Sequence, residues 1–138
     1  MNINPIIIVD DDPDDLELIT EAFTELKVQN ELIVFDNGSD FLEYMRKTEK
    51  KIFFILCDVN MQKINGLEMK KAIAADDRLR LKCVPFLFIS TSKSSPEIER
   101  AYSYNVQGYF VKPLKFEQLV DMLRSMVVYW GYSLHPNS

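Results

Sequence analysis

Five short apolar runs, separated by segments in which apolar residues recur at helical spacing, constrain the fold of this chain more than any other feature. The runs are rich in Ile, Val, Phe and Leu, and they cover residues 5–9, 32–35, 52–57, 84–89 and 108–111. The first, third and fourth runs are almost continuously apolar, which is expected of strands buried on both faces of a parallel sheet. The shorter second or fifth run suits an edge strand. The sequence therefore predicts five strands.

The intervening segments predict helices at residues 13–27, 40–49, 67–76, 96–104 and 115–130. In the first of them one apolar stripe, suited to face a sheet, comprises Leu16, Ile19, Phe23 and Leu26. Asp12 and Ser95 each precede a proline that suits the first helical position, and Ser39 is a third candidate N-cap. Five strand–helix repeats with right-handed crossovers predict a doubly wound α/β domain over residues 1–130, followed by a short tail at 131–138.

Composition excludes several classes of function. The length of 138 residues suits one domain, and a net charge of −5 disfavours binding to nucleic acid. No apolar run approaches the roughly 18 residues that span a bilayer, and no secretory leader is evident, so we expect no membrane association and a cytoplasmic location. Cys57 and Cys83 adjoin apolar runs, which predicts buried free thiols and no disulfide.

Polar residues occupy the carboxyl ends of four of the five predicted strands, where open parallel sheets bind their ligands. These residues are Asp10, Asp11 and Asp12 after the first strand, Asp58 after the third, Ser90 and Thr91 after the fourth, and Lys112 after the fifth. Carboxylates gathered at one edge repel each other unless a hard cation neutralises them. Magnesium fits this ligand type, with manganese as an alternative, because the sequence has no cluster of His or Cys for a softer metal.

Asp58 can act differently from the two acids that would hold the metal. A carboxylate is a known nucleophile toward phosphoryl groups, and Lys112 with the Ser90 hydroxyl could neutralise and position the phosphoryl oxygens. Taken alone, Asp58 could be a turn residue, and Lys112 or Ser90 an ordinary surface residue at a strand end. Their joint occurrence at the carboxyl ends of the strands favours a functional site. Asp12, Asp14 and Asp15 are instead interpreted as acids that favour a helix start, and they are left out of the site.

Four motifs follow one another along the chain: Val9-Asp10-Asp11-Asp12, Cys57-Asp58-Val59-Asn60-Met61 with Gly66, Ser90-Thr91, and Gly108-Tyr109-Phe110-Val111-Lys112-Pro113. In this order they resemble the receiver domain of bacterial two-component response regulators. The resemblance covers nearly the whole chain. It implies a flavodoxin-like sheet flanked by five helices, and a single-domain regulator that signals by phosphorylation rather than by acting on an external substrate.

The resemblance also implies a role for each matching residue. Asp10, Asp11, Asp58 and the backbone carbonyl of Asn60 would bind the metal, and Asp58 would accept the phosphoryl group. The residues that would contact the phosphoryl group or act as switches are Ser90, Thr91, Lys112 and Tyr109. Pro113 would follow a cis peptide bond. The implied partners are a sensor histidine kinase or phosphotransfer protein, a downstream protein target and a second copy of the chain.

The sequence departs from the family pattern at two positions. Gln62 stands where the family usually has Pro, which predicts a less rigid loop between Val59 and Gly66, although Gly66 can still supply its turn. Ser90 replaces the commoner Thr but keeps the hydroxyl.

Two alternatives from other classes remain open at this point. A small magnesium-dependent phosphatase or phosphotransferase could use the same aspartyl phosphate on an external substrate, although position 60 is Asn rather than a second acid. A flavodoxin-like module could bind a phosphorylated cofactor, but the acidic turn after the first strand would repel its phosphate.

Overall fold

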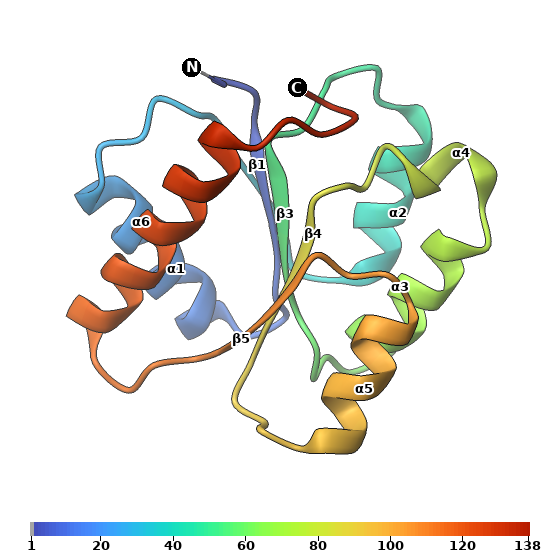
Figure 1. Cartoon of the computed structure of the whole chain (residues 1–138). Coiled ribbons are helices and arrows are strands. Elements are labelled where there is room, and N and C mark those ends of the chain that lie inside the picture. The colour runs from blue at the N-terminus through green and yellow to red at the C-terminus, as the bar shows by residue number, and fades with distance from the viewer. Residues whose placement is uncertain (1) are drawn as a thin grey trace.

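A computed structural model, which describes residues 2–138, has one parallel sheet between two layers of helices (Figure 1). The strands are β1 (Ile6–Val9), β2 (Leu32–Phe35), β3 (Phe54–Asp58), β4 (Phe86–Ser90) and β5 (Gly108–Val111). Their spatial order is β2-β1-β3-β4-β5, and every neighbouring pair is parallel. The doubly wound, flavodoxin-like prediction is confirmed, and both shorter strands lie at edges.

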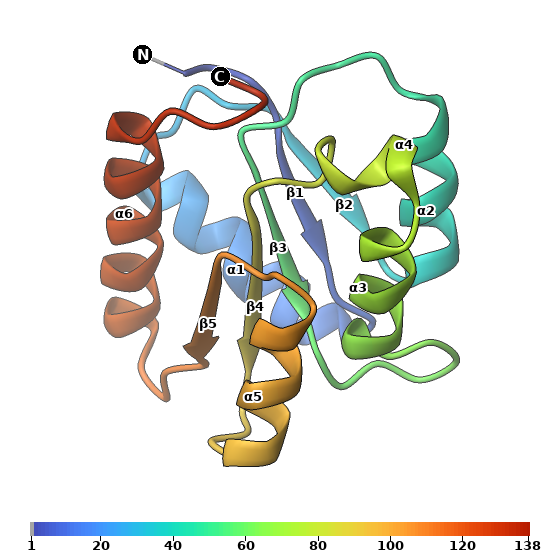
Figure 2. The same cartoon turned by 45° about the vertical axis from the view of Figure 1, so that its right-hand side comes forward.

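The helices divide between the two faces of the sheet (Figure 2). They are α1 (Pro13–Glu25), α2 (Gly38–Lys47), α3 (Gly66–Ala74), α4 (Asp77–Arg80), α5 (Ser95–Ser103) and α6 (Phe116–Tyr132). Helices α1 and α6 pack on the face that carries Ile6, Ile8 and Leu56, and the other helices cover the opposite face. The single turn α4 was not predicted. It begins where the side chain of Asp76 accepts a hydrogen bond from the Arg78 N–H at 2.9 Å.

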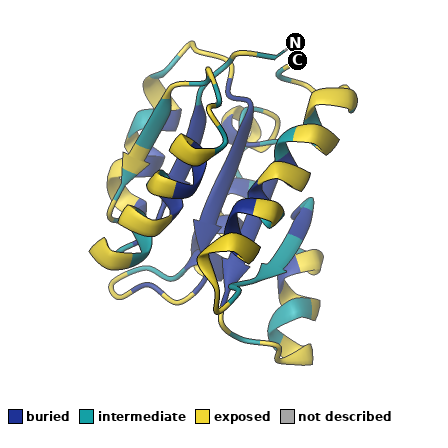
Figure 3. Cartoon of the chain, turned by 90° about the vertical axis from the view of Figure 1, so that its left-hand side faces the viewer, coloured by how far each residue is buried: buried dark blue, intermediate teal, exposed yellow. Residues whose placement is uncertain are grey.

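Burial follows the predicted pattern of the strands (Figure 3). Every residue of β1, β3 and β4 is buried, whereas β2 and most of β5 are only partly covered. Strand β3 begins two residues later than predicted. Ile52 and Phe53 are buried in the core although they precede the strand, so their apolar character extended the predicted run. Asp58 and Ser90 are the last residues of their strands rather than the residues that follow them.

The structure corrects two of the three predicted N-caps. Asp12 caps α1 as predicted and accepts from the Asp14 N–H at 2.9 Å. Asn37, rather than Ser39, caps α2, because Ser39 already lies inside the helix. Ser94, rather than Ser95, caps α5 for the same reason.

The expectation of a cis peptide bond before Pro113 is wrong. Among residues 2–138 the cis bond is the one between Val84 and Pro85, ahead of β4. Trans is the default geometry of an X–Pro bond. With that geometry the Lys112 N–H donates to the Ser90 carbonyl at 2.8 Å, while the Lys112 side chain still reaches the acids described below.

Both chain ends lie at the sheet edge opposite the carboxyl ends of the strands (Figures 1 and 2). Helix α6 continues to Tyr132, two residues past the predicted end. Asn137 attaches the tail to the segment between α4 and β4. Its side-chain amide donates to the carbonyls of Leu81, Lys82 and Val84 at 2.7–3.2 Å. Both cysteines are buried and unpaired, as predicted. No helix within residues 2–138 is long and apolar enough to cross a bilayer.

Candidate functional site

Three predicted acids meet at the carboxyl edge of the sheet. Strands β1 and β3 are neighbours in a register that pairs Val9 with Cys57, so the next residues, Asp10 and Asp58, lie side by side. Asp11 follows Asp10 in the loop to α1. One carboxylate oxygen from each of Asp10, Asp11 and Asp58 lies within 4.8 Å of the others. The sequence predicted that these acids lie at the carboxyl ends of the strands. The strand order of the structure, in which β1 is next to β3, brings them together.

The protein environment works against the charge of two of these acids. Asp10 is only 1% exposed, and this burial raises its pKa from 3.8 to about 6, although the Asp12 N–H at 2.9 Å and the charge of Lys112 act in the opposite direction. Burial also raises the pKa of Asp58, again against the effect of Lys112. The surrounding protein groups alone therefore do not offset the cost of burying the negative charges of Asp10 and Asp58.

Lys112 is the cation that faces this cluster. Its Nζ lies 2.7 Å from Asp15 Oδ2, 3.2 Å from Asp58 Oδ1 and 3.3 Å from Asp10 Oδ2. Burial alone would lower the Lys112 pKa, but the hydrogen bond to Asp15 and the charges of Asp10 and Asp58 outweigh burial and raise it. Lys112 therefore stays protonated at the position predicted for it.

Asp15 is a site residue that the sequence analysis set aside as an ordinary acid of the first helical turn. It does lie in the first turn of α1, but its side chain reaches Lys112 across the sheet edge. No pattern in the sequence distinguishes it from Asp14, which is exposed. Only the packing of α1 against the end of β5 selects it.

A divalent cation fits the donor set of this site. The ammonium group of Lys112 faces three carboxylates, those of Asp10, Asp15 and Asp58, and Asp11 adds a fourth carboxylate beside Asp10 and Asp58. The ligands offered are all oxygen, which suits Mg²⁺ or Mn²⁺. Cys57 adjoins Asp58 but is fully buried, and burial raises the pKa of its thiol well above the usual value, so a thiolate is disfavoured there.

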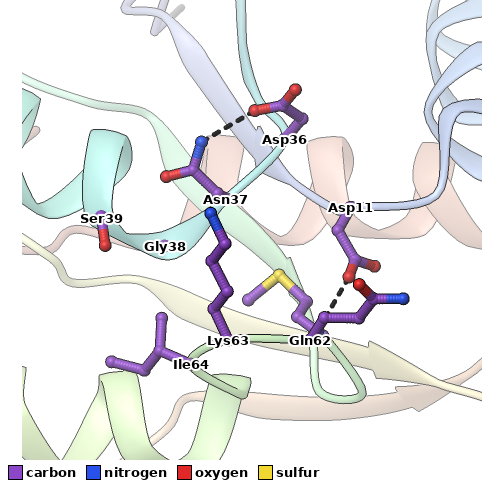
Figure 4. Close-up of a pocket in the computed structure, with 9 residues that line it drawn as sticks. Asp11, Asp36, Asn37, Gly38, Ser39, Gln62, Lys63 and Ile64 are labelled. Atoms are coloured by element: carbon purple, nitrogen blue, oxygen red, sulfur yellow. Dashed lines mark hydrogen bonds between the residues drawn. The ribbon is translucent and has the colours of Figure 1, made fainter.

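Gln62 contributes a contact that a proline could not make. Its backbone N–H donates to Asp11 Oδ2 at 2.8 Å, and this bond ties the loop after β3 to the loop after β1 (Figure 4). The predicted loss of rigidity at this position is therefore offset by a hydrogen bond that holds a candidate metal ligand. A cavity of about 220 Å³ opens beside Asp11, and its lining includes Asn37 and Lys63 (Figure 4).

Ser90 and Tyr109 are brought together on the face covered by α5. The Ser90 hydroxyl lies 3.3 Å from Glu97 Oε2, and the Tyr109 hydroxyl donates to the same carboxylate. Glu97 was not singled out from the sequence. Burial, followed by the hydrogen bond to Glu97, raises the pKa of Tyr109. Thr91 is exposed.

Asn60 was predicted to offer its backbone carbonyl to the metal. It lies in the loop after β3, two residues beyond Asp58, and its side chain is exposed. Its role as a ligand stays a prediction.

Comparison with known proteins gives consistent results. The family model of the response regulator receiver domain matches residues 6–124. The probable methanogenesis regulatory protein FilR2 of Methanothrix harundinacea is 31% identical over 136 residues, which cover 95% of this chain and 86% of that protein. Response regulator Rcp1 of Synechocystis is 23% identical over 130 residues, which cover 91% and 87% of the two proteins.

Solved structures of the same fold cover almost the whole chain. The phosphorylated cyanobacterial phytochrome response regulator RcpA superposes with a TM-score of 0.84 at 25% identity, and the match covers 99% of both chains. The Mn²⁺-bound form of Rcp1 superposes with a TM-score of 0.80 at 22% identity, covering 96% of this chain and 97% of that one. Because the family model spans all five strands and the carboxyl edge of the sheet, the chain belongs to the response regulator receiver domains of two-component signalling systems.

Proposed function

We propose that this receiver accepts a phosphoryl group on Asp58 from the phosphohistidine of a sensor kinase or phosphotransfer protein, in a reaction that requires Mg²⁺ or Mn²⁺. One observation supports the proposal most strongly. The Asp58 carboxylate ends a buried strand, 3.2 Å from Lys112 Nζ and within 4.8 Å of carboxylate oxygens of Asp10 and Asp11. A nucleophile, a cation and a pair of metal ligands thus share one sheet edge.

The chemistry follows from these positions. A carboxylate oxygen of Asp58 attacks phosphorus, and the bond from phosphorus to the donor's histidine nitrogen breaks. That nitrogen keeps the electron pair of the broken bond, and because the other ring nitrogen carries a proton, a neutral imidazole departs. Asp10, Asp11, Asp58 and the Asn60 carbonyl would hold a divalent cation, which would supply positive charge to stabilise the phosphoryl oxygens. Lys112 neutralises further charge once it exchanges a carboxylate partner for a phosphoryl oxygen, and the Ser90 hydroxyl supplies a donor.

The phosphorylated state then acts through another protein. Phosphorylation adds close to two negative charges at Asp58 and redirects the contacts of Ser90 and Lys112. The consequence is a changed surface around Tyr109 that a downstream protein, or a second copy of this chain, recognises. Hydrolysis of the aspartyl phosphate within the same site returns the receiver to its resting state.

The test uses a small phosphodonor, so that it does not depend on the cognate kinase. The intact chain is incubated with Mg²⁺ and acetyl phosphate, and hydroxylamine-sensitive phosphate is measured on the protein. We expect labelling of the natural sequence and of Asp36→Asn, an exposed acid of the neighbouring loop, and loss of labelling in Asp58→Asn. Undiminished labelling of Asp58→Asn, or an unlabelled natural protein that is folded, would contradict the proposal.

A further inference from the structure

Glu97 lies at a helix position where an acidic residue can be explained by its role in capping the helix. It is the third residue of α5, and Ser94 caps that helix, so Ser94 and Glu97 have the spacing of a capping box. In a capping box the glutamate side chain returns to the backbone N–H of the cap residue. Here the Ser94 N–H donates instead to Ser92 Oγ at 3.1 Å. The Glu97 carboxylate is therefore left for another contact.

That contact is a hydrogen-bonded ring of four residues at the end of β4, comprising Ser90, Ser92, Glu97 and Tyr109. The Ser92 N–H donates to Ser90 Oγ at 3.1 Å, and Ser90 Oγ lies 3.3 Å from Glu97 Oε2. The Tyr109 hydroxyl faces Glu97 Oε2 and, at 3.0 Å, the Ser92 carbonyl. Both residues proposed to sense the phosphoryl group thus contact a single carboxylate.

The ring determines where the Ser90 proton points. Ser90 is fully buried, its oxygen accepts from Ser92, and its one proton is directed to Glu97. A phosphoryl oxygen on Asp58 needs that same proton, since Ser90 follows the β4 residue that is paired with Asp58. One hydroxyl cannot donate fully to two acceptors, so the two contacts compete.

We propose that Glu97 is a positioning residue which, in the unphosphorylated receiver, holds the Ser90 hydroxyl and the Tyr109 hydroxyl together and must release Ser90 when Asp58 is phosphorylated. The inference rests on the proposed function of Asp58 and Ser90. In this role Glu97 is a brake, which means that it slows phosphorylation of Asp58 in the resting receiver. It also couples phosphorylation of Asp58 to a change in the contacts of Tyr109. Release of Ser90 leaves the Glu97 carboxylate with the Tyr109 hydroxyl as its remaining partner in the ring, which alters the contacts next to α5.

The first measurement tests the brake. In Mg²⁺ and acetyl phosphate, Glu97→Ala is expected to be labelled about threefold to tenfold faster than the natural protein, the range that the net contribution of one typical intramolecular hydrogen bond gives. Glu97→Gln, which keeps an acceptor oxygen, should fall between them. The matched control is Glu99→Ala, an exposed acid of the same helix, which should leave the rate unchanged.

A double-mutant comparison separates positioning from general structural damage. In the Ser90→Ala background no hydroxyl remains to be held, so adding Glu97→Ala should leave the labelling rate unchanged. An equal acceleration in both backgrounds, or a natural rate in Glu97→Ala alone, would overturn the inference while leaving the proposed function intact.

The second measurement tests the resting contact without any phosphodonor. Ultraviolet titration of the metal-free protein, with Tyr109→Phe to assign the signal, should show the Tyr109 transition moving toward its ordinary value in Glu97→Ala. An unmoved Tyr109 transition would overturn the inference. If Tyr109 responds but the natural protein is never labelled, the proposed function fails first, and the braking role of Glu97 fails with it.

Discussion

At the scale of single residues, several carboxylates face the one ammonium group of Lys112. This excess of negative charge dominates the chemistry of the site. Asp10, Asp15 and Asp58 all lie within 3.3 Å of one ammonium group, and Asp10 is almost completely buried. The folded state therefore carries an electrostatic cost that a bound divalent cation would remove. This cost should be measurable as stability in the absence of metal.

We predict that Asp10→Asn stabilises the metal-free protein. Asparagine can still accept from the Asp12 N–H, but it removes a charge whose pKa is raised to about 6 by burial. The free energy of unfolding in urea with EDTA should increase by about 1–2 kcal/mol, because the folded state no longer carries this buried charge. Added Mg²⁺ should stabilise the natural protein but not the variant. Asp14→Asn, which alters an exposed acid of α1, should change neither quantity.

The same carboxyl group predicts a pH dependence. The Asp10 pKa is about 6 when folded and near 3.8 when unfolded, so between these values the folded protein binds more protons. Stability of the metal-free natural protein, relative to Asp10→Asn, should therefore increase as the pH falls from about 7 to 4. His135, whose pKa burial lowers, has the opposite effect, but it is common to both proteins and cancels. A difference that stays constant across this range would contradict the raised pKa.

At the scale of elements, the start of α3 fixes how closely that helix approaches Asp58. Gly66 has no positive φ, so the expected reason for glycine, freedom to turn, is wrong. Space is the actual reason: a Cβ at Gly66 would lie 2.6 Å from the Asp58 carbonyl oxygen and 2.7 Å from the Phe88 ring. The end of β3 and the start of α3 are in direct contact.

We predict that Gly66→Ala lowers the free energy of unfolding by about 1–3 kcal/mol, the usual cost of overpacking, and slows labelling of Asp58 because the strand end must shift. Chemical denaturation and acetyl phosphate labelling measure the two effects. Gly131→Ala is the matched control, since a Cβ there meets nothing within 4 Å inside α6, and helix propensity should make it neutral or slightly stabilising. Equal stability of the two variants would show that α3 can move away without cost.

At the scale of the whole molecule, the two edges of the sheet have separate tasks. The carboxyl edge holds the acids and Lys112, whereas the opposite edge holds both chain ends (Figure 2). There, Asn137 receives a hydrogen bond from Asn4 at 3.2 Å and donates to the segment ahead of β4. The tail thereby connects the end of α6 to the opposite helical layer.

We predict that Asn137→Ala destabilises the protein by about 1–2 kcal/mol, because it removes the side-chain donor to the backbone carbonyls of Lys82 and Val84. The labelling rate of Asp58 should not change, since the site lies at the other edge. Thermal unfolding and acetyl phosphate labelling measure both. Leu134→Ala, which truncates a tail residue that is 89% exposed, should leave the midpoint of unfolding in place. A slower labelling rate in Asn137→Ala would show that the two edges are coupled.

The family match decides between the alternatives that the sequence left open. A receiver domain explains the acids after β1 without a phosphorylated cofactor and without an external substrate. The matched segment, residues 6–124, contains each of the four motifs on which the resemblance rested.

The sequence alone determined the five strands, the doubly wound sheet and the placement of Asp10, Asp11 and Asp58 at the carboxyl ends of its strands. Apolar runs report burial directly, and the carboxyl ends of adjacent parallel strands must converge, so local patterns are enough. The tertiary structure alone decided which other side chains join them. Asp15 and Glu97 resemble ordinary acids of a first helical turn, and their partners lie on other strands. Such contacts depend on how helices pack across the sheet, because the direction of a side chain toward a distant strand leaves no local periodicity in the sequence.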